Sequence, residues 1–381
     1  MTPKLHDAPG TGEAPPPGKK RPSARRKLLL SAVALVFSFV VAEGLLHVAG
    51  IEIMADRLVR DPVLGWRNRP GYVGETFRVN SRGFLGPELE LEKAPGVVRV
   101  VCLGDSCTAG DLLDAPDQTY PRQLASALAE RYPTRTFEVI NAGVGSYSSF
   151  QGRAWLEQEL IHLRPNVLVV YFGWNDHWSA RAGGTDRKVS GSAVERVRAW
   201  LGWSKVVQLF VRAWRQVRGR RAAVAVERGD AIGAAATGKL RVPVGEYEGN
   251  LKAMVELVRR KGGQAILLTA ASYLELGTKR GIPDVAESLG GDASAVQAVN
   301  RVHRQYNERV REVAQATGAC LVDVARLFES EGMPQRLFWR PAPQGGKAIP
   351  IDFIHLSPEG YGRLARYVAQ APPFANTPPE R

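Results

Sequence analysis

The chain has 381 residues, of which 44% are hydrophobic and 23% charged, so it can form one large globular domain or two smaller ones. Its net charge of +13 is local, because seven Lys/Arg residues in 1–27 and ten in 187–221 account for the excess. This distribution argues against a general nucleic-acid-binding surface. Three cysteines are too few, and odd in number, for a disulfide framework.

The N-terminus reads as a cytoplasmic tail followed by a membrane anchor. Residues 1–27 are rich in Pro and Gly, end in a basic cluster and are expected to be disordered. Residues 28–50, LLLSAVALVFSFVVAEGLLHVAG, are long enough to cross a bilayer and carry Glu43 and His47 only near their distal end. Six Lys/Arg residues in 19–27 place the N-terminus inside. We therefore expect a single-pass protein of the cytoplasmic membrane, with its catalytic domain periplasmic or otherwise outside the cytoplasm.

Two alternatives to the anchor stay open. A signal peptide cleaved near Ala42 would give a secreted protein, since small residues follow the apolar run there. A buried helix of a soluble domain would also be apolar. The long basic preface and the apolar residues beyond Glu43 favour a retained anchor.

Residues 51–95 are expected to form a juxtamembrane segment with a small β hairpin in ETFRVNSRGF, and 96–371 to form the main domain. Within that domain, strand-like and helical patterns alternate, which predicts a parallel sheet covered on both faces. The predicted fold is a three-layer α/β/α sandwich with a flavodoxin-like parallel five-stranded sheet. Strands are expected at 97–104, 137–142, 166–173, 264–271 and 319–324, and helices at 118–132, 151–163, 247–261, 295–317 and 358–370. Residues 372–381 are expected to be a loose tail.

A long insertion, residues 179–245, interrupts this alternation. Apolar residues recur in it at helical spacing and interleave with basic ones; they are Trp200, Trp203, Val207, Phe210 and Trp214. One interpretation is a helix packed on the core. The other is an interfacial helix over 195–221 that lies against an anionic membrane or covers the active-site mouth. The sequence does not decide between them.

Two adjacent nucleophiles, Ser106 and Cys107, stand in CLGDSCTAGD at the carboxyl end of the strand predicted at 97–104. Ligands bind at this edge in open α/β sheets, and a following helix directs its free N–H groups there. No Gly-x-Ser-x-Gly elbow occurs, which argues against the α/β-hydrolase fold.

A base for such a nucleophile can be sought among only six histidines. His177 and His355 remain once those in the tail, the apolar segment and helical patterns are set aside, namely His6, His47, His162 and His303. Asp352 precedes His355 by three residues, where a carboxylate can hold imidazole Nδ1 and stabilise the imidazolium. Ser357 and Pro358 then suit the start of the last helix.

Four stretches in this order resemble the sequence blocks of the SGNH hydrolases, also called the GDSL family of esterases and lipases. They are GDS at 104–106, NAGVGSYSS at 141–149, GWND at 173–176 and DFIH at 352–355. The resemblance covers about residues 96–371, with the insertion as an addition.

Carried over to this chain, the resemblance implies Ser106 as nucleophile, His355 as base and Asp352 as the residue that orients it. It implies the Ser106 N–H and the Asn175 side-chain amide as oxyanion donors. At a helix start, neighbouring residues point about 100° apart, so a reactive Ser106 turns Cys107 away.

The third oxyanion donor departs from the family pattern. The family usually has a glycine five residues after the second-block asparagine, and this chain has Ser146 there. A backbone N–H does not require glycine, so Ser146 can donate if its backbone is tolerated; Gly143 and Gly145 are the fallbacks. Neighbouring residues are expected to line the substrate pocket, namely Asp105, Trp174, Asp176 and His177.

The resemblance implies a serine esterase or acylhydrolase that works through an acyl-enzyme, and location favours an acyl or O-acetyl ester of an envelope glycan or lipid. No cofactor is expected, and no metal, because no His/Cys/carboxylate cluster has metal-ligand spacing. One alternative is an O-acyltransferase that passes the acyl group to a sugar hydroxyl. Another is a non-catalytic module that binds the envelope or its glycans.

Overall fold

Five parallel strands form the central sheet, in the order β4-β3-β5-β6-β7. The computed structural model describes residues 24–49, 57–74, 76–178, 204–210, 213, 238–274, 293–332, 334–340 and 352–376. The predicted five-stranded parallel sheet is confirmed, and each strand overlaps its expected range. The strands are β3 Val97–Gly104, β4 Thr136–Gly143, β5 Val167–Tyr171, β6 Gln264–Leu268 and β7 Cys320–Val322.

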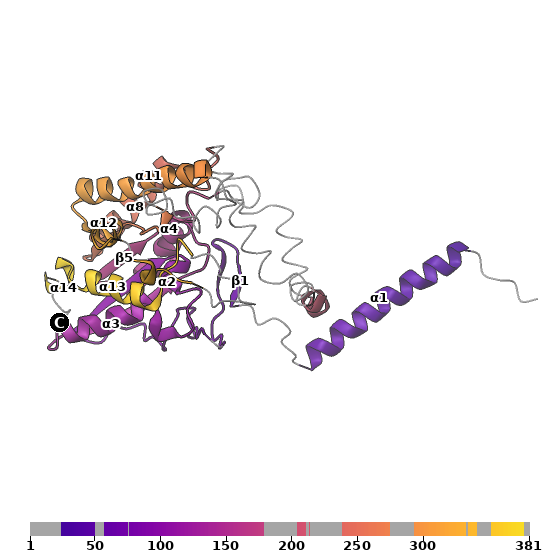
Figure 1. Cartoon of the computed structure of the whole chain (residues 1–381). Helices are drawn as coiled ribbons and strands as arrows, with labels where there is room; N and C mark the ends of the chain where they lie inside the picture. Colours follow the sequence, from indigo (N-terminus) through magenta and orange to yellow (C-terminus); the bar gives the residue numbers. More distant parts are fainter. Residues whose placement is uncertain are drawn as a thin grey trace, which may run out of the picture.

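The sheet is buried on both faces, as a parallel sheet requires. Alternate residues of β3 enter two separate clusters of buried apolar side chains: Val100 and Cys102 belong to one, and Val101 and Leu103 to the other. The first cluster includes side chains of α3 and α13, and the second those of α4, α8 and α11. Figure 1 shows α8 and α11 on the opposite side of the sheet from α3 and α13. The three-layer architecture is thereby confirmed.

The helices begin and end within a few residues of the predicted positions. The expected helix 151–163 is divided, since α4 ends at Gln158 and a 3-10 turn covers Leu160–Leu163. The helices are α2 Ser106–Ala109, α3 Tyr120–Arg131, α4 Ser149–Gln158, α8 Val244–Arg260, α11 Ala293–Thr317, α12 Val324–Ser330, α13 Pro358–Ala369 and α14 Pro372–Asn376, with further 3-10 turns at Pro116–Gln118 and Gln335–Leu337.

The strand order creates a switch point beside β3. The chain leaves β3 to form β4 on one side and then crosses to form β5 on the other. Loops that follow β3 and β5 therefore diverge at the carboxyl end of the sheet, where open α/β folds bind ligands.

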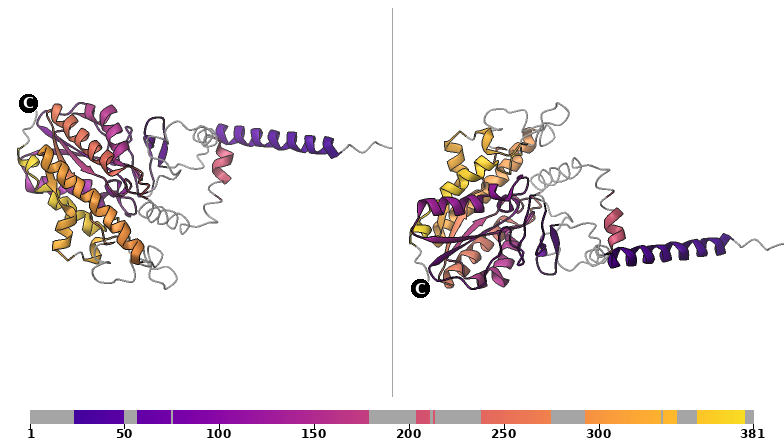
Figure 2. Two further views of the ribbon diagram at one scale, coloured as in Figure 1. Left: turned by 90° about the horizontal axis from the view of Figure 1, so that it is seen from above. Right: turned by 90° about the horizontal axis from the view of Figure 1, so that it is seen from below.

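The N-terminal hairpin lies earlier than expected. Strands β1 Leu58–Asp61 and β2 Gly65–Asn68 pair antiparallel, whereas the described part of the expected hairpin, residues 76–84, contributes only isolated bridges. The reason is turn chemistry: the Asp61 carboxylate accepts the N–H groups of Val63 and Leu64 at 2.9 and 2.8 Å. Gly65 then takes a positive φ of 82°. The hairpin lies on the side of the domain that faces α1 (Figures 1 and 2).

The expected loose tail is partly wrong, because α14 is packed. Phe374 is fully buried and stands edge-on to Phe137, with ring centroids 6.2 Å apart. Burial of this aromatic ring outweighs the low helix propensity of its proline neighbours. Residues 377–381 lie outside the described residues.

Helix α1, Ala24–Val48, holds the apolar segment, and its stretch Lys27–Val48 is long and apolar enough to cross a membrane. Residues 1–23 of the expected disordered tail lie outside the described residues. Of the insertion, residues 204–210, 213 and 238–245 are described, and 205–210 are helical. The expected face is seen at Phe210, which is 73% exposed, while Trp200, Trp203 and Trp214 lie outside the described residues.

Candidate active site

Ser106 is the first residue of α2, directly after β3. The carboxylate of Asp105 caps this helix by accepting the Cys107 N–H at 2.9 Å. The turn needs a glycine before it, since a Cβ at Gly104 would lie 2.0 Å from Thr108 Oγ1. The Gly-Asp-Ser sequence therefore presses the helix against the sheet and leaves Ser106 partly exposed at its start.

The loop before α13 brings a histidine to this serine. The Nε2 atom of His355 lies 2.9 Å from Ser106 Oγ, and its Nδ1 lies 3.1 Å from Asp352 Oδ2. Asp352 Oδ1 accepts the backbone N–H groups of Ile354 and His355, both at 2.8 Å. All three residues expected to form a Ser-His-Asp array are thus in one hydrogen-bonded chain.

This loop is held at both ends. Trp339 donates its N–H to the His355 carbonyl and accepts the N–H of Asp352, each at 2.9 Å. Ser357 caps α13 by accepting the Gly360 N–H at 3.1 Å, and Pro358 is the first residue of that helix. The imidazole is therefore oriented by backbone contacts as well as by its carboxylate.

The charges of the pair shift both pKa values in opposite directions. Burial disfavours the imidazolium of His355, but attraction to the Asp352 carboxylate outweighs it and raises the pKa of His355 to about 9. Burial likewise opposes ionisation of Asp352, while His355 and two backbone N–H groups lower its pKa overall. The pair is thus built to stabilise a protonated imidazole.

Asn175, from the loop after β5, also reaches the serine turn. Its Nδ2 donates to Asp105 Oδ2 at 3.1 Å, so a single carboxylate bridges Asn175 and the start of α2. A side-chain amide has two N–H donors, and the second is left for a ligand. Asp105 is buried, and that burial raises its pKa to about 6.

Ser146 has the backbone conformation of a glycine, with φ +63°. The loop must pass close to α2, because a Cβ at Gly143 would lie 2.2 Å from Ala109 N. Within the part of the chain that the structure describes, the Ser146 N–H donates no hydrogen bond. It is therefore available to a ligand, as the sequence block suggested.

A family comparison agrees with this geometry. The model of the GDSL-like lipase/acylhydrolase family matches residues 102–363. The chain belongs to this family. It is accordingly an ester-cleaving hydrolase with the SGNH fold. Among curated proteins no match was found.

Solved structures of similar fold include a lipase/acylhydrolase from Enterococcus faecalis, 16% identical, covering 74% of this chain and 98% of its own, with TM-score 0.43. They also include an acetylxylan esterase from Geobacillus stearothermophilus, which is 18% identical; the match covers 71% of this chain and 91% of that chain, with TM-score 0.42. An α/β hydrolase from the metagenome of Lake Arreo, Spain, is 21% identical; the match covers 72% of this chain and 94% of that chain, with TM-score 0.42. At these identities and TM-scores the likeness says nothing about substrate.

The four residues expected to line the substrate pocket of this GDSL hydrolase are placed otherwise. Each of their side chains is at most 2% exposed. The four residues are Asp105, Trp174, Asp176 and His177. Asp176 Oδ1 accepts the Ser149 N–H at 2.9 Å and so joins two active-site loops. The expectation was wrong because their side chains point into the protein and support the loops from beneath.

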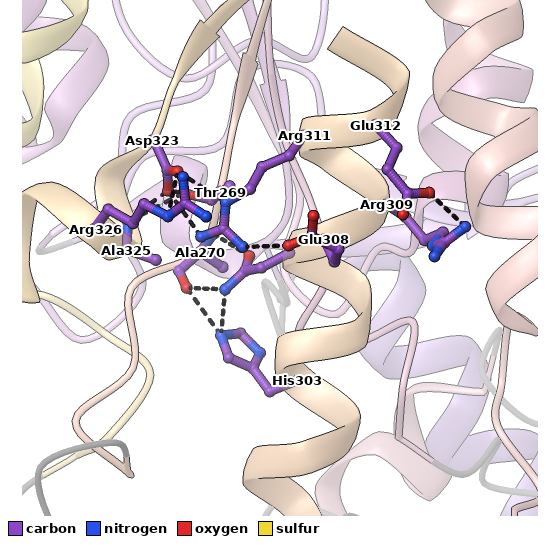
Figure 3. Close-up of polar contacts among 11 residues, drawn as sticks. Thr269, Ala270, His303, Glu308, Arg309, Arg311, Glu312, Asp323, Ala325 and Arg326 are labelled. Atoms are coloured by element: carbon purple, nitrogen blue, oxygen red, sulfur yellow. Dashed lines mark hydrogen bonds and ion pairs between the residues drawn. The ribbon is translucent and has the colours of Figure 1, made fainter. Parts of the chain in front are cut away.

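Trp174 and the two buried histidines form an aromatic stack under the Asn175 loop. The rings of Trp174 and His303 are 3.9 Å apart and nearly parallel, and His177 Nε2 lies 3.2 Å from His303 Nδ1. His303 also reaches the Ala270 carbonyl at 2.8 Å (Figure 3). Burial lowers the pKa of His303 to about 4, and burial together with the charge of His303 also lowers the pKa of His177. The sequence left His177 open as a base, and the structure assigns it to this neutral stack.

Cys107 is turned away from the active site of the hydrolase. Its thiol is buried and points at the Ile354 carbonyl at 3.9 Å. Burial first, and then the charges of Asp105 and Asp352, raise its pKa well above the ordinary value. A thiol that does not ionise is a poor nucleophile.

Sequence reasoning missed the residues that surround the Ser146 loop. Trp66 Nε1 donates to the Gly145 carbonyl at 3.0 Å, and Arg241 donates to the Ser146 carbonyl at 2.8 Å. Arg57 pairs with Asp111 at 2.6 Å beside the same loop. They lie in the juxtamembrane segment, the insertion and a loop, outside every recognised block, so no local motif could have found them.

Proposed function

We propose that this hydrolase cleaves its ester through a Ser106-His355-Asp352 triad and an acyl-enzyme. The observation that carries the proposal is the 2.9 Å contact of Ser106 Oγ with His355 Nε2, continued at 3.1 Å to Asp352. In this order a serine has a base within reach, and the base has a carboxylate that fixes its tautomer.

In the first half-reaction, Ser106 Oγ attacks the acyl carbon and its proton passes to His355 Nε2. The carbonyl π-electrons move to oxygen, and the resulting oxyanion collapses with loss of the alcohol, which takes the proton from His355. In the second half-reaction, water attacks the acyl-enzyme and gives its proton to His355. Collapse releases the acid and returns that proton to Ser106. Asp352 stays ionised throughout and stabilises each imidazolium.

The oxyanion would be held by three donors on three loops. They are the Ser106 N–H at the start of α2, the Ser146 N–H and the Nδ2 of Asn175. The free N–H of Ser146 and the bridge from Asp105 to Asn175 support this assignment. Donors placed in advance stabilise developing charge without reorganisation.

We propose that α1 anchors the enzyme in the cytoplasmic membrane with its catalytic domain outside. The length and apolarity of Lys27–Val48 and the basic residues before it support this topology. Such a location favours an acyl ester of an envelope glycan or lipid, and places soluble cytoplasmic esters out of reach.

The insertion contributes a second membrane contact in this proposal. Glu43 of α1 accepts hydrogen bonds from Ser204 Oγ and the Lys205 N–H, each at 2.7 Å, and so caps the helix over 205–210. Leu209 and Phe210 on that helix are 45% and 73% exposed. A short amphipathic helix held at the outer end of a membrane span would lie at the lipid interface.

Replacement of Ser106 tests the function. The Ser106→Ala enzyme should lose hydrolysis of p-nitrophenyl acetate and labelling by a fluorophosphonate probe, while Cys107→Ala should keep both. Retained hydrolysis by folded Ser106→Ala would overturn the proposal. Failure of the native enzyme to take up the probe would instead favour a binding module with the same fold.

A further inference from the structure

Two peptide groups flank Ser146, and each is held by a side chain from outside the sheet. Trp66 Nε1 on β2 binds the carbonyl of the Gly145–Ser146 peptide at 3.0 Å. Arg241, just before α8, binds the carbonyl of the next peptide, Ser146–Tyr147, at 2.8 Å. Both carbonyls are therefore fixed in direction.

A trans peptide points its C=O and N–H in opposite directions. The carbonyl of Gly145 faces the hairpin, so the N–H of Ser146 in the same peptide plane points away from it. That N–H has no partner among the described residues. Rotation of this plane would bury the N–H against the hairpin and present a carbonyl oxygen to the developing oxyanion.

The conformation that needs this support is a strained one. Ser146 has φ +63°, a region that residues with a Cβ occupy at a cost. A serine there is stable only where its surroundings fix the backbone. The two side-chain donors supply that constraint at the position where the family usually has a glycine.

Trp66 and Arg241 also support each other. The Arg241 guanidinium lies 5.8 Å from the centre of the Trp66 ring, and its second arm donates to Gln151 Oε1 at 2.8 Å. Gln151 in turn donates to the Leu64 carbonyl of the hairpin at 3.0 Å. The hairpin, α4 and the end of the insertion thus meet around one loop.

We propose that Trp66 and Arg241 are positioning residues that hold the Ser146 N–H in the oxyanion hole. The inference rests on the proposed function, because it requires that Ser146 donate to the oxyanion. It assigns a role in turnover to the juxtamembrane hairpin and to the end of the insertion.

The test uses the full chain in detergent, with p-nitrophenyl acetate as substrate. Trp66→Phe and Arg241→Met should each lower kcat about tenfold to a hundredfold, since the misdirected donor is one of three. KM should change less than about threefold, and Arg241→Lys, which keeps one donor, should recover part of kcat. Loss of fold alone would not separate kcat from KM in this way.

A matched control removes a similar contact elsewhere. Arg311→Met deletes a half-buried guanidinium paired with Asp323 (Figure 3). This control should keep kcat within about twofold of the native enzyme. Equal kcat values in the test and control variants would overturn the inference.

A second measurement decides the matter even if Trp66→Phe fails to fold. Arg241→Met should cost less than about threefold in kcat when combined with Ser146→Gly, because glycine accepts the positive φ without help. The same loss with serine and with glycine at position 146 would show a merely structural role. Activity in Ser106→Ala would refute the proposed function itself, and inactivity there with unaffected Trp66 and Arg241 variants would refute only this inference.

Discussion

His355 Nε2 lies 2.9 Å from Ser106 Oγ although 249 residues separate the two in sequence. The serine begins the helix after β3, and the histidine stands on the loop before α13. The contact places an imidazole beside a serine hydroxyl before any substrate is bound, as the proposed mechanism requires.

Removing the carboxylate behind this base should change both the rate and its pH dependence. In Asp352→Asn, kcat should fall at least about a hundredfold, because the tautomer and the imidazolium lose their partner. Asp352 raises the pKa of His355, so its loss lowers that pKa. The acid limb of kcat/KM is expected near pH 9 in the native enzyme, where His355 titrates, and should move to lower pH in the variant. A limb that stays in place would argue that another group acts as the base.

We expect the ionised Asp105 carboxylate to lower the stability of the fold while it supports activity. Its pKa is raised by burial from 3.8 to about 6, so the folded protein binds this proton more tightly than the unfolded chain does. Stability from this group is therefore present at low pH and is lost as pH rises toward 6. Asp105→Asn should unfold at a higher temperature at pH 7, by up to about 2 kcal/mol of stability, while kcat falls because Asn175 is no longer held. A lower unfolding temperature would contradict this account of Asp105.

Ser146→Gly should be a stabilising change. Glycine adopts the positive φ of this position freely, and the substitution should add about 1 kcal/mol to the free energy of unfolding. The donor is a backbone group, so kcat should stay within about twofold. Thermal unfolding and p-nitrophenyl acetate hydrolysis measure the two effects. Reduced stability would mean that the Ser146 side chain itself contributes.

The exposed pair on the insertion helix should bind lipid. Residues 51–381, which lack the anchor, should float with liposomes that contain anionic lipid, and the Leu209→Ser/Phe210→Ser double variant should float several-fold less. Deletion of 195–221 should have at least the same effect. Flotation unchanged by either alteration would remove the insertion from the membrane contact.

Much of the sheet could be predicted from the sequence, because each strand of a parallel sheet is a short apolar run with loops at both ends. The hairpin was misplaced, since the Asp61 carboxylate that closes its turn outweighs the alternating pattern at 75–84. Phe374 was assigned to a loose tail because its partner Phe137 is far away in sequence.

The residues of the candidate site likewise divide into those that the sequence predicted and those that it did not. Ser106, Asn175, Asp352 and His355 were predicted because they lie in blocks that resemble those of the family, and hydrogen bonds bring the four side chains around one turn through Asp105. Burial was not visible, and for that reason Trp174 and His177 were expected to face a pocket. Trp66 and Arg241 act on backbone carbonyls, and a contact of that kind leaves no signature in the side chains around the loop.

The short link between α1 and the hairpin limits how far the hairpin can lie from the end of α1. Val48, the last residue of α1, and Leu58 of β1 are ten positions apart in the sequence, and ten extended residues span at most about 35 Å. If α1 is a membrane anchor, as proposed, and the hairpin must stay seated for turnover, Ser106 is confined to a short distance from the bilayer. Its substrates would then be esters on lipids, or on the first sugars above the bilayer, and esters in the outer layers of the envelope would lie out of its reach.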